Sequence, residues 1–323
     1  MKSYWIITRG NEAQLERREV PIPQPKAGDV AIRVHASAFN RGELIVGGAV
    51  HGGPEKLGGN EASGEITAIG EGVTGWKVGD RVMARVRGGF AEYALAYAGQ
   101  LMPMPERLTW EEAAAVPSTF ITAYEAMVQY GGLRSGEWVL VTGVSAGTGV
   151  ACVLIAKELG ARSIGTSGSA ANLAKLKTIG LDAALNTRAP DFAAQVREIT
   201  GGKGVNLAVN LVGASLVPEI LRSLDRSGRL AIVGYVNGTY RAEIDFEALH
   251  VNRYHIFGIS NAKLTLEERF ETTRGFVRDI LPAIVAGRIS PVVDSVFSFD
   301  DLPAARARMD AESRVGKVVV RVA

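Results

Sequence analysis

The chain has 323 residues, 47% of them hydrophobic, and a formal net charge of +2. This length favours two domains, and the hydrophobic content is enough to bury sizeable cores. The small net charge, with Lys and Arg scattered along the chain, argues against nucleic acid or an anionic membrane as a partner.

Cysteine content and hydropathy indicate a cytoplasmic protein. Cys152 is the only cysteine, so no internal disulfide can form, and its apolar neighbours indicate a small packed thiol. No apolar stretch approaches the ~20 residues of a membrane span. The opening residues, MKSYWIITRG, lack the apolar core of a signal peptide, so we expect the protein in the cytoplasm.

The chain is strand-like and turn-rich up to about residue 105, which predicts a compact β domain. The turn signals are Pro21, Pro23, Pro25, the glycine pairs at 47–48, 52–53 and 58–59, and GEGVTGWKVGDRV at 70–82. A capping box at Thr109 and Glu112 then predicts a helix start. Pro117 marks a boundary before a helix from about Thr119 to Gly131.

The central segment reads as strand, glycine-rich turn, helix and strand. Trp138 to Val141 has the length and branching of a buried parallel strand. The glycines that follow are Gly143, Gly147 and Gly149. Glycine adopts backbone angles that other residues resist, and it lets a pyrophosphate approach the amides at a helix start. The helix closes at Gly160, and Arg162 to Thr166 predict the return strand.

The glycine pattern departs from the usual G-x-G-x-x-G, because residues 144–149 read VSAGTG. The interpretation as a dinucleotide-binding turn is strengthened by the segments that follow, in which a strand-like run comes after a helix-like segment three times. The strand-like runs are Asp182–Leu185, Val205–Val209 and Arg229–Val233. This alternation predicts a doubly wound parallel sheet that binds its ligand at the carboxyl ends of the strands.

The alternation stops near residue 260. The remaining pattern is a long helix over Leu266–Val285, a strand over Pro291–Phe297, a helix over Asp301–Met309 and a strand over Lys317–Val322. We expect this tail to return to the first domain, which leaves a nucleotide cleft between the two. The apolar run Tyr254–Ser260 would be the last strand of the cofactor sheet, and an apolar edge strand is usually covered.

The whole chain resembles the medium-chain dehydrogenase/reductase superfamily, and within it the zinc-free quinone oxidoreductase branch that includes zeta-crystallin. The motifs that carry the resemblance are ASAFN at 36–40, GNEASG at 59–64, GVTGWKVGDRV at 72–82, GGFAEY at 88–93, TAYEA at 122–126, GVSAGTG at 143–149, ITGGKGVNLAVNLVG at 199–213 and RVGKVVV at 314–320. The resemblance implies a GroES-like β-rich catalytic domain, residues 1–120 and 263–323, with a Rossmann doubly wound domain, residues 121–262. It also implies a homodimer through the edge strand.

Zinc is the first question, because zinc alcohol dehydrogenases of this superfamily hold the metal with Cys, His and Cys. The matching positions here are close to Asn40–Gly42, Asn60 and Ser118, which are not good zinc ligands. The histidines lie in no usual ligand spacing and read as packing or surface residues: His35, His51, His250 and His255. We therefore predict no metal, and without a Lewis acid alcohol oxidation is disfavoured as the main activity.

The end of the second predicted strand favours NADPH over NADH. NAD enzymes usually place an Asp or Glu there to bind the ribose hydroxyls, whereas this chain has Ser167 followed by Gly168. Hydroxyls and backbone amides can accept a 2'-phosphate at that place. Lys175 on the following helix is a further candidate contact, although an exposed helix lysine is more often a solvated charge.

The resemblance supplies the remaining site residues. The expected cofactor contacts are Thr122, Gly143, Ser145, Ala146, Gly147, Thr148, Gly149, Ser167, Gly168, Lys175, Val212, Gly213, Gly234 and Tyr235. The expected catalytic residues are Asn40, Glu43 and Tyr235. Asn40 either binds an acceptor carbonyl or ties down a loop. Glu43 and Glu61 either titrate in the cleft or hold the fold, and Tyr235 is either a proton donor or a packing residue.

The expected activity is zinc-independent hydride transfer from NADPH to a quinone-type acceptor, with geometry and water exclusion as the main catalytic devices. Several quinone reductases of the family bear a tyrosine in the substrate loop, where this chain has Ile45, Val46 and His51. An NADPH-dependent reductase of enone or enal double bonds is therefore the alternative. A non-catalytic NADPH-binding protein is a further one. The short-chain dehydrogenase turn TGxxxGxG also fits 142–149, but no Tyr-x-x-x-Lys pair accompanies it.

Overall fold

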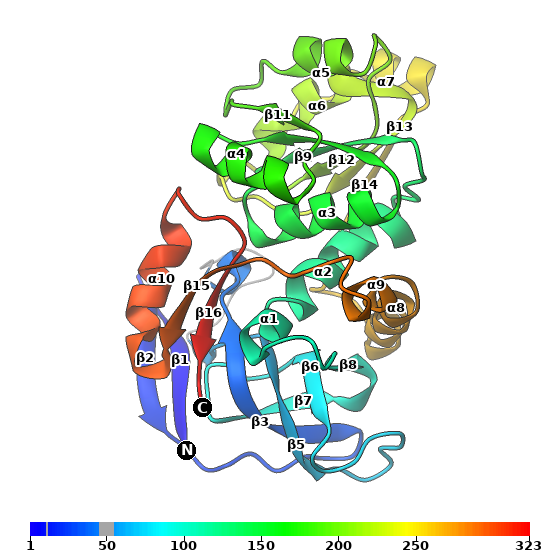
Figure 1. Cartoon of the computed structure of the whole chain (residues 1–323). Helices are drawn as coiled ribbons and strands as arrows, with labels where there is room; N and C mark the ends of the chain where they lie inside the picture. The colour runs from blue at the N-terminus through cyan, green and yellow to red at the C-terminus, as the bar shows by residue number, and fades with distance from the viewer. Residues whose placement is uncertain (11, 45–54) are drawn as a thin grey trace.

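The computed structural model describes residues 1–10, 12–44 and 55–323, which form two lobes (Figure 1). Within these residues, a seven-stranded sheet of order β15-β16-β3-β5-β6-β8, with β7 paired to β3, organises the lobe that holds both termini. Its strands are β3 (Asp29–Ala38), β5 (Glu61–Ile69), β6 (Arg81–Arg85), β7 (Tyr93–Tyr97), β8 (Leu101–Pro103), β15 (Val293–Ser298) and β16 (Lys317–Arg321). A smaller sheet joins β1 (Lys2–Arg9), β2 (Glu12–Glu19) and β4 (Glu55–Leu57).

The end of the chain returns to the first lobe, as the sequence predicts. β16 pairs antiparallel with β3, with Val319 opposite Ala38. Most residues of both strands are small or branched apolar residues that are buried, which suits a sheet covered on both faces. α1 (Trp110–Ala114) contacts β3 on one face, and α10 (Leu302–Asp310) contacts β16. The predicted capping box of α1 is present between Thr109 and Glu112.

The second lobe is a six-stranded parallel sheet, of order β11-β10-β9-β12-β13-β14 in the described chain. Its strands are β9 (Trp138–Thr142), β10 (Arg162–Thr166), β11 (Ala183–Leu185), β12 (Val205–Asn210), β13 (Leu224–Ile232) and β14 (His255–Gly258). Its helices are α3 (Gly147–Glu158), α4 (Ala170–Ile179), α5 (Ala193–Ile199), α6 (Val217–Ser223) and α7 (Phe246–Asn252).

Alternate residues of β9 explain why helices cover both faces of this sheet. Val139 and Val141 point to one face and share a core with α3 and α4, whereas Leu140 points to the other and shares a core with α5 and α6. All three residues are fully buried. The strand order, with crossovers on both sides of β9, is that of the predicted doubly wound sheet.

Two helix predictions differ from the structure because of proline. The predicted helix over 266–285 is two helices, α8 (Leu266–Asp279) and α9 (Leu281–Val285). Pro282 has no N–H and its ring clashes with the carbonyl four residues earlier, so the first helix cannot continue. Pro117 is the first residue of α2 (Pro117–Tyr124) rather than a boundary before it, a position that proline favours. A π-helical segment, η3 (Glu125–Gln129), continues α2.

α2 lies at the junction of the two lobes, and the limits proposed for the domains, residues 121 and 262, fall between the two sheets in the sequence (Figure 1). Four short 3-10 helices complete the described elements: η1 (Arg41–Leu44), η2 (Ala98–Gln100), η4 (Ala214–Leu216) and η5 (Phe299–Asp301). Among the described residues, no helix is long and apolar enough to cross a membrane.

Candidate active site

A cavity of about 680 Å³ is lined by residues from both lobes. From the cofactor sheet it receives the residues that follow β9, β10, β12 and β13, among them Gly143, Ser167, Val212 and Gly234. These are the carboxyl ends of parallel strands, where doubly wound sheets bind their ligands. The volume lies in the range of small-molecule and cofactor sites.

The glycines of the first turn have different functions. Gly147 begins α3 and lines the cavity, and a Cβ there would lie 2.7 Å from Cδ of Lys317 and 2.9 Å from Cγ2 of Thr119. Gly149 does not line the cavity. A Cβ at Gly149 would lie 2.5 Å from the carbonyl oxygen of Val144, so this glycine allows α3 to pack on the turn.

The start of α3 is a ready anion site. The residue before it, Ala146, has no side-chain oxygen to accept from the first amides of the helix. Those N–H groups have no partner within the helix, and the helix dipole makes this end positive. The turn residues Ser145, Ala146, Gly147 and Thr148 line the cavity. The predicted phosphate-binding turn is therefore open to a ligand.

Asn210, which the sequence analysis did not single out, holds the turn after β12. Its fully buried Oδ1 accepts from the amides of Val212 at 3.1 Å and Gly213 at 3.2 Å, and Thr142 Oγ1 donates to it at 3.0 Å. Nδ2 of Asn210 donates to the Gly213 carbonyl at 2.9 Å. Val212 lines the cavity, whereas Gly213 lies behind it at φ +147.

Arg188 takes the place expected for Lys175 beside the end of β10. Ser167 and Gly168 line the cavity as predicted, but Lys175 is exposed on α4 and does not. The Arg188 side chain covers Gly168 so closely that a Cβ there would collide with it. Its guanidinium is paired with the Glu312 carboxylate at 2.7 Å. Both of these charged residues line the cavity.

Arg314 is a second cation of the cavity that the sequence analysis quoted only within a motif. Its Nε is buried without a hydrogen-bond partner in the described part of the chain, while NH1 donates to the Gly316 carbonyl at 2.9 Å. Burial lowers the pKa of Arg314 to about 10, so the guanidinium stays charged at neutral pH. A buried donor without a partner on a cavity wall is suited to an anionic ligand.

The predicted catalytic residue Asn40 belongs to a polar cluster on the cavity wall, beside the start of α3. Nζ of Lys317 donates to the Phe39 carbonyl at 2.6 Å, to Asn40 Oδ1 at 2.8 Å and to Glu61 Oε1 at 2.6 Å. Nδ2 of Asn40 lies 2.7 Å from both Glu61 Oε1 and Asn60 Oδ1. Asn40, Asn60 and Lys317 line the cavity.

Glu43 and Tyr235, the other two predicted catalytic residues, are not among the residues that line the cavity. Glu43 is 7% exposed, and its carboxylate accepts from Nδ2 of Asn40 at 3.2 Å and from the amide of Gly59 at 3.0 Å. Burial raises the pKa of Glu43 to about 7. Tyr235 is 43% exposed and its ring faces Tyr240 at 5.3 Å.

The structure thus brings most of the predicted site residues together. Those that line the cavity are Asn40, Thr122, Gly143, Ser145, Ala146, Gly147, Thr148, Ser167, Gly168, Val212 and Gly234. Those that do not are Glu43, Gly149, Lys175, Gly213 and Tyr235. The substrate-loop residues that stand where several quinone reductases have a tyrosine lie outside the described residues. They are Ile45, Val46 and His51.

The three positions that match zinc ligands do meet in space. Asn40, Asn60 and Ser118 all line the cavity, and they offer amides and a hydroxyl. The described residues contain no group of three or more His, Cys, Asp and Glu side chains that could hold a metal. His35 stacks on Trp110 with ring centroids 4.2 Å apart. The fully buried thiol of Cys152 has a pKa well above its usual range because of desolvation.

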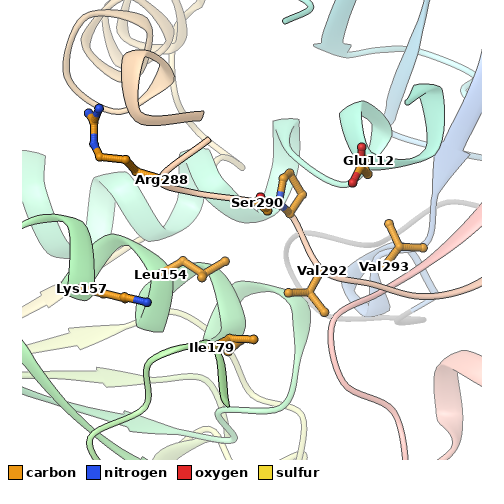
Figure 2. Close-up of a pocket in the computed structure, with 9 residues that line it drawn as sticks. Glu112, Leu154, Lys157, Ile179, Arg288, Ser290, Val292 and Val293 are labelled. Carbon is orange, nitrogen blue, oxygen red and sulfur yellow. The ribbon is translucent and has the colours of Figure 1, made fainter. Parts of the chain in front are cut away.

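A second hollow, of about 480 Å³, shares no lining residue with this cavity (Figure 2). It lies between the end of α3, the end of α4 and the segment that leads into β15. Leu154, Ile179 and Val292 form its apolar wall, with Lys157 and Arg288 at one side (Figure 2). Arg288 is already paired with Glu158, at 2.9 Å.

Comparison with known proteins agrees with this arrangement. The family model of the alcohol dehydrogenase GroES-like domain matches residues 26–106, and that of the zinc-binding dehydrogenase matches residues 147–278. Human quinone oxidoreductase is 27% identical over 96% of this chain and 94% of its own length. A phenolphthiocerol/phthiocerol polyketide synthase of Mycobacterium tuberculosis is 29% identical over 95% of this chain, which spans 14% of that much longer relative.

Among solved structures, a mycobacterial protein in complex with NADPH superimposes with a TM-score of 0.88 at 26% identity, and the alignment covers 100% of both chains. The predicted fold class is therefore confirmed: a GroES-like β-rich domain joined to a Rossmann-type doubly wound sheet.

Proposed function

The chain belongs to the medium-chain dehydrogenase/reductase superfamily, in its quinone oxidoreductase-like branch, and on that basis we propose that it transfers hydride from NADPH to a quinone-type acceptor without zinc. The family fold makes it an oxidoreductase with a nicotinamide cofactor. The observation that carries the proposal is a single cavity lined both by the anion-binding start of α3 and by the amides and hydroxyl of Asn40, Asn60 and Ser118, which stand where zinc ligands would be expected.

The residues of the cavity fit a dinucleotide. The amides at the start of α3 would hold the pyrophosphate, because they have no partner within the helix and the turn residues before them line the cavity. The unpaired Nε of Arg314 would supply a donor to the same charged group. The turn fixed by Asn210 would present the backbone at Val212 to the nicotinamide half. When bound, NADPH supplies the hydride, and the protein supplies binding, orientation and exclusion of water.

The preference for NADPH rests on charge at the end of β10. Ser167 stands where a carboxylate would repel a 2'-phosphate, and Arg188 lies over the next residue, Gly168. The guanidinium of Arg188 is 62% exposed and paired with Glu312, so it can exchange that carboxylate for a phosphate. Arg188 therefore replaces Lys175 as the proposed phosphate contact.

The chemistry of the donor set supports the proposed independence of zinc. Neutral amide and hydroxyl groups at Asn40, Asn60 and Ser118 are poor substitutes for thiolate and imidazole ligands. A simple alcohol needs a Lewis acid or a base to form its alkoxide, whereas a quinone is already electron-poor. We therefore propose reduction of activated acceptors rather than oxidation of alcohols.

A reductase of enone or enal double bonds is the second candidate. Hydride transfer to such an acceptor leaves charge on the carbonyl oxygen, and the amide groups at the Asn40 end of the cavity are suited to bind that oxygen. A protein that binds NADPH without turnover is the third.

One experiment separates the three. NADPH absorbance is followed with chelator present, against 1,4-benzoquinone, a naphthoquinone, an enone and a simple aldehyde, with NADH in parallel. Fast oxidation by quinones supports the main proposal, and turnover of the enone alone supports the second candidate. Tight NADPH binding with no turnover supports the third.

We also propose a homodimer through β14. This strand ends the cofactor sheet, and Ile256 on it is 36% exposed. Exposed apolar edges usually pair or are covered. Sedimentation equilibrium should give twice the mass of one chain, and a monomer at micromolar concentration contradicts the dimer. We further propose that the protein is cytoplasmic, which fractionation of producing cells tests.

A further inference from the structure

The amide of Asn40 has a fixed orientation because of its charged neighbours. A lysine ammonium only donates hydrogen bonds and an ionised carboxylate only accepts them. Lys317 donates to one atom of the Asn40 amide, which must therefore be the oxygen, and Glu61 accepts from the other, which must be the nitrogen. Both charged side chains are almost fully buried, at 4% and 0% exposure, and hold this geometry away from water.

The orientation of Asn40 in turn fixes that of Asn60. Because Asn40 presents Nδ2 to its neighbour, the atom of Asn60 that receives this bond, at 2.7 Å, must be Oδ1. The other end of the Asn60 amide is then the NH2 group. Nδ2 of Asn60 has no hydrogen-bond partner among the described residues, and the side chain is exposed on the cavity wall.

The neighbouring donors of the cluster are already engaged. All three N–H bonds of the Lys317 ammonium have acceptors in the protein. The two N–H bonds of Asn40 are shared among the oxygens of Glu43, Asn60 and Glu61. Within this cluster, as far as the structure describes it, the Nδ2 group of Asn60 is thus the free amide donor.

We propose that Asn60, rather than Asn40, is the catalytic residue that donates a hydrogen bond to the carbonyl oxygen of the acceptor, and that Lys317 and Asn40 are positioning residues that orient it. This inference rests on the proposed function, since it concerns the acceptor of that reaction. It narrows the substrate to carbonyl compounds conjugated to a double bond, which include quinones and enones.

Electrons and protons balance for a conjugated acceptor. A C–H bond of the reduced nicotinamide breaks with its electron pair, and a new C–H bond forms at the far carbon of the conjugated system. The π electrons move toward the carbonyl, and the negative charge comes to rest on its oxygen. Asn60 keeps its proton and stabilises this charge by hydrogen bonding, and water later supplies the proton. A donor of this kind contributes ~10²–10³ in kcat in a measured case.

The test uses three variants at the site. Asn60→Ala removes the donor, Asn60→Asp replaces it by an acceptor of the same shape, and Thr122→Val removes another hydroxyl of the wall, which accepts from Arg85 at 3.2 Å. Asn252→Ala on α7 is the matched control outside the cavity. Because Asn60 is exposed, its variants are expected to fold.

Two readouts are combined. The first is the absorption band of 4-dimethylaminocinnamaldehyde with NADP⁺ present, which shifts to longer wavelength when the carbonyl oxygen accepts a hydrogen bond and needs no turnover. The second is acceptor-dependent NADPH oxidation, with the Kd of NADPH measured separately. The expected result is loss of the shift and a ~10²-fold lower kcat in both Asn60 variants, with an unchanged Kd for NADPH and less effect in the Thr122 and Asn252 variants.

Lys317→Met tests the positioning role. It frees the Asn40 amide to rotate, so the spectral shift should weaken although Lys317 does not touch the acceptor. An Asn60→Ala protein that keeps both the shift and kcat overturns the proposal, and so does a wild-type protein that never shifts the probe. A further outcome is a wild-type protein that shifts the probe and fails to oxidise NADPH with every acceptor tried. That result refutes the proposed function and leaves Asn60 as the group that binds a carbonyl oxygen.

Discussion

The ammonium of Lys317 lies 2.6 Å from the carboxylate of Glu61, and the two side chains are 4% and 0% exposed. Lys317 begins β16, the last strand, and Glu61 begins β5. The second oxygen of Glu61 accepts from the amide of Ser118 at 2.7 Å. One buried ion pair therefore joins the end of the chain, the β domain and the entry to α2 beside the cavity.

Removing the cation of this pair should strongly destabilise the protein. Lys317→Met leaves Glu61 buried without its counter-ion, which costs about 3–5 kcal/mol of unfolding free energy. Lys317→Met combined with Glu61→Gln should lose less than the single change, because no charge is stranded. Urea denaturation measures both. Lys77→Met removes an ion pair in which the lysine is 82% exposed and should change stability by less than about 1 kcal/mol. Equal losses for Lys77→Met and Lys317→Met would refute this assignment.

Cofactor choice should depend on the end of β10. Ser167→Asp places a carboxylate where a 2'-phosphate is proposed to bind, so the ratio of NADPH to NADH affinity should fall by about tenfold or reverse. Arg188→Ala should weaken NADPH and leave NADH nearly unchanged, because NADH has no phosphate there. Fluorescence titration of both cofactors measures the ratio, with Lys175→Ala, at an exposed position of α4, as a control. A ratio that is the same in all four proteins would count against NADPH recognition at this place.

The unfolding free energy of the protein should depend on pH through the titration of Glu43. Burial raises the pKa of this carboxyl from 4.5 to about 7, so the folded protein binds a proton that the unfolded chain has already lost. The contribution of Glu43 to unfolding free energy therefore falls as pH rises from about 4.5 to about 7, by up to about 3 kcal/mol, and is level above that. Glu43→Gln should flatten this fall, and Glu198→Gln, at an exposed position of α5, should not. Urea denaturation at four pH values gives the curves, and parallel curves for wild type and Glu43→Gln would be the opposite result.

The packing glycine of the turn should matter for folding. A Cβ at Gly149 would lie 2.5 Å from the carbonyl oxygen of Val144, which is backbone and cannot rotate away. Gly149→Ala should lower unfolding free energy by about 1–3 kcal/mol. Gly42→Ala is the control, because a Cβ there meets no described atom within 4 Å. Equal stability of Gly149→Ala and the wild type would mean that α3 can shift without loss.

Local signals predicted the framework of the molecule. The central parallel strands β9 and β12 were readable because each is a short and mostly buried run, and α1 because its capping box is local in sequence. Pro282 explains why the one long predicted helix is two. The periodic apolar pattern continues through this residue, but the interior of a continuous helix does not tolerate proline, whereas the first turn of a new helix does. The ligand edge of the second lobe followed from the alternation of strand-like and helix-like segments.

The composition of the site was less readable, because it depends on residues that are distant in sequence. Lys317 reaches Glu61 across 256 positions, and Arg188 meets Glu312 across 124. Neither pair has a local pattern. Lys317 and Arg314 do stand in the quoted motif RVGKVVV, which is the signal that the sequence offers for them. Lys175 was chosen because it lies on the helix that follows the second predicted strand, whereas the fold brings Arg188 to that place instead.

The most direct test of the central claim is NADPH oxidation by 1,4-benzoquinone, with enzyme whose metal content has been removed by chelation and verified by elemental analysis. Deuterium at the transferred position of the nicotinamide reports whether hydride transfer occurs in the measured step. The account predicts saturable oxidation, unchanged by metal removal, with a primary isotope effect in single turnover. Activity that disappears with the metal and returns with added zinc would contradict it.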